Sequence, residues 1–115
     1  MKKNKTMKKL KMKTITLDFL NVEIRLYCGR RKIMEEEAKK LGLPELGAEL
    51  YGACYDKPIY IEKGKPCFVM WVSRNNGQLI IHEGSHLVDA IFDYTGMNDG
   101  ELRANLMDYI YEKFV

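Results

Sequence analysis

The two histidines of this 115-residue chain lie in one five-residue stretch, His82-Glu83-Gly84-Ser85-His86. Four residues make about one turn of an α-helix, so on a helix both imidazoles project from the same face and can reach one metal ion at about 2.0–2.1 Å. Glu83 lies beside the pair, where its carboxylate can take a proton from a water that the ion activates. The spacing predicts a hydrolytic zinc site with His82 and His86 as ligands and Glu83 as general base.

A hydrolytic zinc ion usually has three protein ligands and one water. No histidine or cysteine follows His86, which leaves the downstream carboxylates Asp89, Asp93, Asp99, Glu101, Asp108 and Glu112. Asp93 lies about 10 Å further along the helix axis than His86, and Asp89 is turned away from the midpoint of the histidines. Glu101 opens a second helix that a short loop can fold back over the first, so we predict Glu101 as the third ligand. The alternative is an Asn98-x-x-Glu101 capping box, in which the glutamate only bonds back to the cap residue.

The helix that must position the histidines is predicted over residues 78–94. Ile80, Leu87 and Ile91 recur there at helical spacing, and the run contains no proline. Gly84 falls on this apolar stripe, which indicates close packing against a neighbouring element. Residues 94–100 break the helix, and a second periodic run begins at Glu101.

The stretch HEGSHLVDAIFDYTGMNDGELRANLMDYIYE, residues 82–112, resembles the active-site half of small zincin metallopeptidases in which a glutamate is the third ligand. It is similar to the ImmA/IrrE family, whose second helix carries a Glu-x-x-Ala-Asn pattern, and to small phage-encoded proteins assigned as metallopeptidases. Here the pattern reads Glu101-Leu102-Arg103-Ala104-Asn105.

The resemblance implies a phage or prophage gluzincin that hydrolyses peptide bonds, with Zn²⁺ held by His82, His86 and Glu101. Asn105, one turn after Glu101, would bond to a ligand histidine and fix its tautomer. The resemblance also makes residues 67–73 the strand that pairs with an extended substrate, a mode that suits a peptide or protein substrate.

The oxyanion of such a reaction needs a further donor, and two tyrosines are candidates. Tyr109 lies two turns beyond Glu101 on about the same face, and Tyr94 lies near the end of the first helix; a packing role is open for both. A different class of function also fits: an inactive zincin-fold protein with an interaction or virion-associated role, with or without a structural metal.

Length and composition predict one domain in a reducing compartment. The 115 residues are 46% hydrophobic, enough for a single modest core. Cys28, Cys54 and Cys67 show no paired spacing, which indicates free thiols, and neither a signal-peptide core nor an 18-residue apolar run occurs. We expect a cytoplasmic protein.

Seven lysines precede the first acidic residue: Lys2, Lys3, Lys5, Lys8, Lys9, Lys11 and Lys13. We therefore assign residues 1–13 as a flexible basic tail and residues 14–115 as the zincin-like domain. Without them the formal net charge of +3 becomes −4. Such a tail favours weak contact with nucleic acid or an acidic partner. The alternative is that these residues are only a solvated leader, or that they follow from an upstream start codon, with Met7 and Met12 as later translation starts.

The remaining chain reads as strands around one helix. Apolar residues alternate with other residues in two short runs, at odd positions in residues 15–19 and at even positions in residues 22–26. This change predicts a tight turn or bulge near Leu20 and Asn21. A charged helix is predicted over Arg31–Leu41 with Gly42 as its stop, residues 43–53 are ambiguous, and residues 58–62 and 67–73 form a hairpin. The predicted fold class is α+β: a small antiparallel or mixed sheet packed against three helices, the last two carrying the metal site.

Overall fold

The computed structural model describes residues 9–48 and 51–115, and its centre is a five-stranded mixed sheet. The strands are β1 (Lys11–Leu17), β2 (Val22–Cys28), β3 (Gly52–Cys54), β4 (Ile59–Glu62) and β5 (Lys65–Val72). Their order is β1-β2-β5-β3, with β4 also paired to β5. The β2–β5 pair is parallel and the others are antiparallel.

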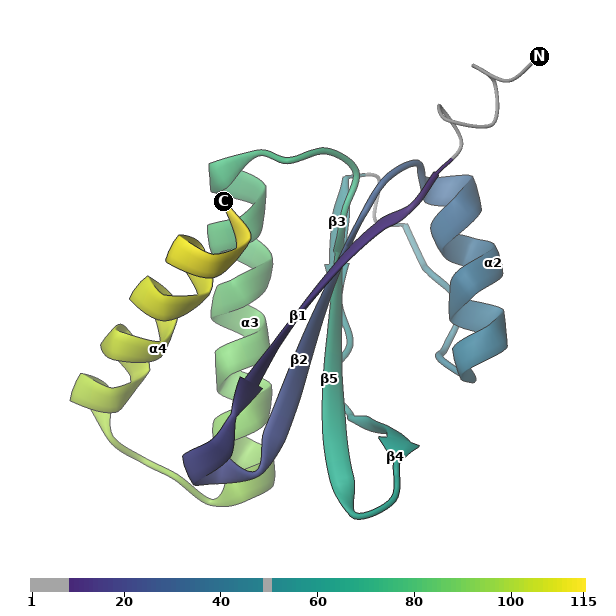
Figure 1. Cartoon of the computed structure of the whole chain (residues 1–115). Coiled ribbons are helices and arrows are strands. Elements are labelled where there is room, and N and C mark those ends of the chain that lie inside the picture. Colours follow the sequence, from purple (N-terminus) through teal and green to yellow (C-terminus); the bar gives the residue numbers. More distant parts are fainter. Residues whose placement is uncertain (1–8, 49–50) are drawn as a thin grey trace.

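Helices cover both faces of this sheet (Figure 1). One face carries α2 (Arg31–Leu41), and the other carries α3 (Gly77–Thr95) and α4 (Gly100–Phe114). The predicted α+β class, with a mixed sheet and three α-helices, is confirmed. No helix in residues 9–48 or 51–115 is both long and apolar enough to cross a membrane.

The β1–β2 hairpin contains the predicted change of parity. A 3₁₀ turn, η1 (Asp18–Leu20), joins the strands, and Asn21 adopts the left-handed conformation with φ of 55°. Asparagine tolerates this conformation better than most residues, and here its side-chain amide donates a hydrogen bond to the main-chain oxygen of Gly64 at 3.2 Å. Ile15 and Leu17 thereby face Ile24 and Val22 across the ladder.

Strand β5 contributes side chains to the hydrophobic cores on both faces of the sheet, because each of its residues from Cys67 to Val72 is buried. Phe68, Met70 and Val72 face α3 and α4, while Cys67, Val69 and Trp71 face α2. An uninterrupted apolar run is typical of a strand covered on both faces.

Two predictions about strand position are wrong. The strand at residues 67–73 is not an edge, because β2 pairs with one side of it and β3 and β4 with the other. Strand β5 therefore has no free edge with which an extended peptide could pair. The last strand in the sheet order after β5 is β3. Strand β1 begins at Lys11, so Lys11–Lys13 belong to the sheet and not to a tail; residues 1–8 lie outside the described residues.

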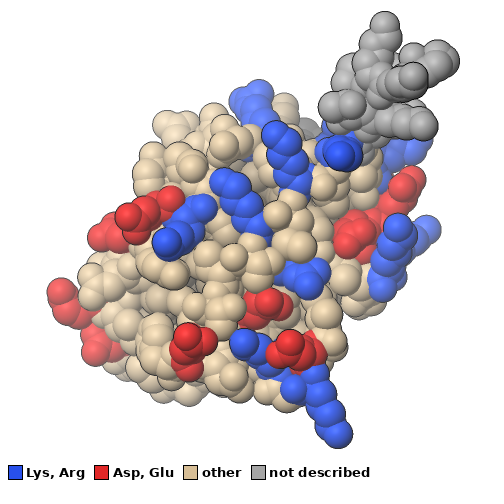
Figure 2. Space-filling view, in the orientation of Figure 1, with Lys and Arg blue, Asp and Glu red and all other residues tan. Residues whose placement is uncertain are grey.

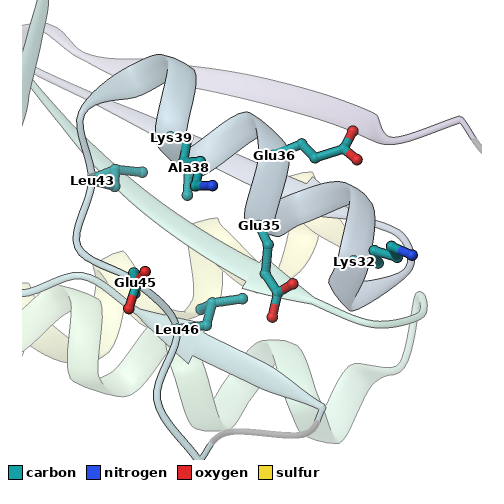
Figure 3. Close-up of a pocket in the computed structure, with 8 residues that line it drawn as sticks. All are labelled: Lys32, Glu35, Glu36, Ala38, Lys39, Leu43, Glu45 and Leu46. Carbon is teal, nitrogen blue, oxygen red and sulfur yellow. The ribbon is translucent and has the colours of Figure 1, made fainter.

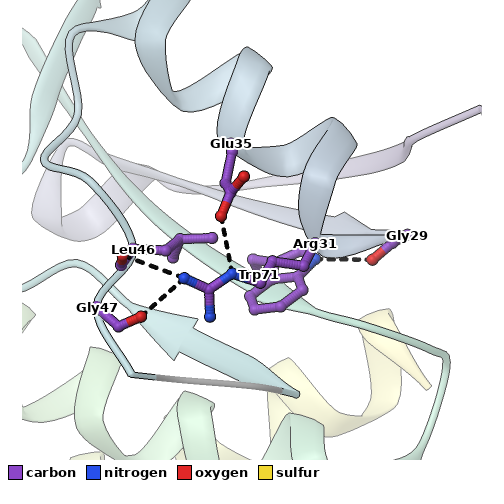
Figure 4. A network of polar contacts seen from close by, with 6 residues as sticks. All are labelled: Gly29, Arg31, Glu35, Leu46, Gly47 and Trp71. Carbon is purple, nitrogen blue, oxygen red and sulfur yellow. Dashed lines mark hydrogen bonds and ion pairs between the residues drawn. The ribbon is translucent and has the colours of Figure 1, made fainter.

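Helix α2 has the predicted bounds and ends at Gly42, whose φ is 75°. Arg31, on its first turn, bonds to Glu35 at 2.8 Å and to the main-chain oxygens of Leu46 and Gly47 at 3.2 and 2.7 Å (Figure 4). The ambiguous segment after Gly42 is thus held as irregular chain by an arginine from α2. A hollow of about 340 Å³ lies between α2 and the segment after Gly42, and lysines, glutamates and leucines are among the residues that line it (Figure 3).

Candidate metal and catalytic site

Helix α3 positions the histidine motif and confirms the helix predicted over residues 78–94. The Asn76 side chain caps its start by accepting hydrogen bonds from the N–H groups of Gln78 and Leu79 at 2.9 and 3.1 Å. Gly96 ends it with φ of 76°. The stripe of Ile80, Leu87 and Ile91 is buried against the sheet.

The two histidines lie on the solvent side of α3. Both are exposed, their ring centroids are 5.0 Å apart, and the ring planes are inclined by 87°. Neighbouring imidazoles on one helix face suit a common metal ion, so this pair fits two positions of a zinc site.

Glu83 differs from its neighbours in the motif because its side chain turns inward. Only 8% of the residue is exposed, and it is the one buried charged residue of the described chain. It lies against Gly52 of β3: a Cβ built there would be 3.0 Å from Glu83 Oε2 and 3.1 Å from its Cγ. Because glycine has no side chain, β3 leaves room for the carboxylate. The sequence reasoning missed Gly52, since it lies in the stretch without a clear pattern.

Cys54, two residues further along β3, lies within electrostatic reach of the same carboxylate. Burial raises the pKa of the Cys54 thiol to about 12, and the charges of Glu83 and Asp56 act in the same direction. The thiol is therefore protonated at neutral pH. Metal ligation requires a thiolate, which disfavours Cys54 as a ready zinc ligand.

Gly84 faces α4, as its place on the apolar stripe indicated. A Cβ at Gly84 would meet Ile110 Cγ2 at 3.5 Å and Met107 Cε at 3.7 Å. These are ordinary van der Waals distances. The helices are in contact here, but alanine would fit the same space.

The start of α4 contradicts the capping-box alternative. Asp99 is the cap residue, and its carboxylate accepts hydrogen bonds from the N–H groups of Glu101 and Leu102 at 2.9 and 3.1 Å. Asn98 is thus not the cap, and Glu101 is the second helical residue instead of the third. A capping box needs the glutamate at the third position.

The packing of α4 decides where Glu101 points. Arg103 bonds to Asp89 Oδ1 at 2.9 Å and to Ser85 Oγ at 2.8 Å, so the side of α4 that carries Arg103 faces α3. Glu101 is two residues earlier, about 200° around the helix, and its side chain is exposed. It therefore lies on the far side of α4 from α3.

The structure does not bring Glu101 to the histidines. Among residues 9–48 and 51–115, no three His, Cys, Asp or Glu side chains are grouped closely enough to hold a metal ion. The histidine pair fits two zinc ligands, whereas a third ligand is not in place in this arrangement. Zinc binding and the role of Glu101 stay predictions.

Asn105 and Tyr109 lie on another side of α4. Both line an open hollow of about 490 Å³ between α4 and the end of β1, together with Leu17 and Phe19. This position does not bring Asn105 to a ligand histidine, and it turns Tyr109 toward β1.

Tyr94 shares the side of α3 that carries Glu83, about 20° away around the helix but about 16 Å further along the axis. Its ring packs edge-on against Phe68 with centroids 5.6 Å apart, and its hydroxyl hydrogen-bonds to that of Tyr60 on β4. This bond is the main cause that raises the pKa of Tyr60. Tyr94 therefore joins α3 to the edge of the sheet.

The chain matches no protein-family model, and comparison with curated proteins and with solved structures found no significant match. The expected resemblance of residues 82–112 to zincin metallopeptidases therefore rests on the residues of the motif alone and stays a prediction. The structure places the two histidines on the exposed side of α3 and Glu83 on its buried side, against β3 at one end of the sheet order.

Proposed function

We propose that the protein is a zincin-like, zinc-dependent metallopeptidase in which His82 and His86 bind the metal and Glu83 is the general base. The main support is the position of Glu83, which is buried while both histidines are exposed. Glutamate is rarely buried in proteins, so a buried carboxylate on a helix that also carries two exposed histidines is an arrangement expected of a functional site. Gly52 provides the space that this orientation needs.

Bound zinc would polarise the scissile carbonyl and lower the pKa of its water. Glu83 would take the proton from that water and transfer it to the leaving amine. Strand β3 replaces residues 67–73 as the element that pairs with an extended peptide, because it ends the sheet order beside Glu83. Main-chain pairing selects for an unfolded segment more than for a particular sequence.

Glu101 is the proposed third ligand. For its carboxylate to reach the metal, the first helical turn of α4 must rotate toward α3 when the metal binds. The Arg103–Asp89 ion pair opposes this movement, but its side chains are 35% and 63% exposed. An exposed pair of this kind contributes about 0–1 kcal/mol. Gly96 and Gly100 flank the connection, and a Cβ at either would meet nothing within 4 Å.

The orientation of Glu101 also favours a second candidate: a zincin-like protein that binds zinc, or no metal, without hydrolysis and serves as an interaction or virion-associated protein. The same α3 would then carry a two-histidine surface site. Hydrolysis distinguishes the two candidates, since both can bind zinc.

The experiment measures the zinc content of the purified protein and its cleavage of denatured and native protein substrates. One zinc per chain is expected, and His82→Ala should abolish it; undiminished zinc in that variant would place the metal elsewhere. Glu83→Gln should keep the zinc and lose cleavage, whereas Glu112→Gln, the same change at an exposed site of α4, should keep both.

Glu101→Gln tests the third ligand separately. A neutral amide oxygen is a much poorer partner for Zn²⁺ than a carboxylate, so zinc affinity should fall severely while the stability of the metal-free protein stays nearly unchanged. Unchanged affinity would remove Glu101 from the site. Stoichiometric zinc without any Glu83-dependent cleavage would favour the second candidate.

A further inference from the structure

A basic hollow lies at the opposite end of the sheet from the β1–β2 turn. Its volume is about 420 Å³, and Lys9, Lys11 and Lys13 line it. Leu26, Val72 and Phe114 form its apolar lining and are themselves buried. Asn75, from the connection before α3, and Cys28, at the end of β2, also line the hollow.

The lysines of this hollow are available for a ligand. All three are exposed, and no carboxylate is among the residues that line the hollow. The ion pairs within residues 9–48 and 51–115 are formed by arginines, at Arg25, Arg31 and Arg103. Lys13 Nζ donates a hydrogen bond to the main-chain oxygen of Phe114 at 3.4 Å, which leaves its other protons free for a further acceptor.

The strand geometry gives these charges a regular spacing. Lys11 and Lys13 are two residues apart on β1, so they share one face at a separation of about 6.6 Å. In Figure 2, lysine and arginine side chains gather across the upper half of the face on which β1 lies, and acidic side chains lie at its sides and below. A row of cations around a shallow hollow suits a chain of regularly spaced anions.

We propose that this face, defined by Lys9, Lys11 and Lys13, binds the phosphodiester backbone of nucleic acid without sequence selectivity. A backbone ligand is favoured over a membrane because the apolar residues of the hollow are buried and form its floor, whereas a membrane-binding surface presents apolar side chains for insertion. The hollow contains no exposed aromatic ring on which a base could stack. Binding by charge alone is expected to be weak and strongly dependent on salt.

The experiment uses the full chain and a fluorescein-labelled oligothymidylate that exceeds the site size of about 4–16 nucleotides typical of single-strand-binding domains. Fluorescence anisotropy gives the affinity between about 50 and 200 mM salt. Each phosphate contact contributes about 0.7 to the slope of log affinity against log salt, so Lys9→Gln, Lys11→Gln and Lys13→Gln together should lower the slope by about 2.

The matched control replaces Lys32, Lys39 and Lys40 by glutamine. These lysines lie on α2, on the other face of the sheet, and are also exposed. Because three lysines are replaced in each variant, the control changes the net charge by the same amount. It should leave the slope nearly unchanged. An equal loss in both triple variants, or no loss in the first, would refute the assignment to this face.

Cys28 provides a readout that does not depend on substitution of the lysines. Its thiol lines the hollow, whereas Cys67 is buried on the α2 side of the sheet. Bound oligonucleotide should slow the alkylation of Cys28, measured by mass spectrometry, and leave Cys67 unchanged. Unchanged alkylation of Cys28 with oligonucleotide bound would place binding elsewhere. Sedimentation with phosphatidylserine vesicles, but no binding to oligonucleotide, would overturn the choice of ligand.

Discussion

Substitution of Gly52 by alanine tests whether β3 holds the carboxylate of Glu83 in place. The added Cβ would lie 3.0 Å from Glu83 Oε2 and 3.1 Å from the main-chain oxygen of Trp71. The glutamate side chain can move, but the Trp71 oxygen belongs to β5, which is paired on both sides. The strain must therefore be relieved by a shift of β3 and of Glu83.

The magnitude follows from the two effects of this substitution. Overpacking of this kind costs about 1–3 kcal/mol. Replacement of glycine also restricts the unfolded chain, which offsets about 0.4–1 kcal/mol. We expect a net loss of about 1–2 kcal/mol, equivalent to a decrease in Tm of roughly 4–8 °C for a domain of this size. Displacement of the general base by about 1 Å should lower the cleavage rate by about 10²-fold.

Gly84→Ala is the matched control, because its Cβ would meet only ordinary contacts at 3.5 and 3.7 Å. Alanine is a better helix former than glycine, so this variant should be as stable as the parent or more stable by up to about 1 kcal/mol. Circular dichroism gives Tm for both variants, and the zinc content and peptide cleavage are measured on the same samples. If Gly52→Ala retained both the Tm and the cleavage rate of the parent, the packing of Glu83 against β3 would have no bearing on function.

The remaining predictions concern the cap of α4 and the thiol of Cys54. Asp99→Ala should lower the free energy of unfolding by about 0.5–2 kcal/mol, because two N–H groups lose their acceptor, whereas Asn98→Ala should change it little; equal effects in urea denaturation would contradict the assigned cap. Burial raises the pKa of Cys54 to about 12, above the ordinary value of 9.0, so from pH 9 upward the unfolded chain releases a proton that the folded chain keeps. Stability should therefore fall as the pH rises, by at most about 1.4 kcal/mol per pH unit for this thiol. Cys54→Ser should flatten that part of the stability curve between pH 9 and 11, and an unaltered curve would mean that the thiol titrates normally.

Local patterns in the sequence were sufficient for most of the elements. The run of Arg31–Leu41 before Gly42 predicts α2 because helical spacing and a glycine stop are properties of a few adjacent residues. The change of parity near Asn21 predicts the β1–β2 turn for the same reason, since side chains alternate along any strand. The apolar stripe of α3 likewise shows which side of the motif helix is buried, and hence that both histidines face away from the sheet.

The sequence by itself determined the composition of the candidate site: the paired histidines one turn apart and the glutamate beside them. Only the tertiary structure decided that β5 is central, because an apolar run fits any strand with both faces covered and does not reveal its partners. It also decided the orientation of Glu101, which depends on which side of α4 packs on α3 through Arg103 and Met107. Contacts of this kind join residues far apart in the chain, and they are fixed by the packing of whole elements, not by local spacing.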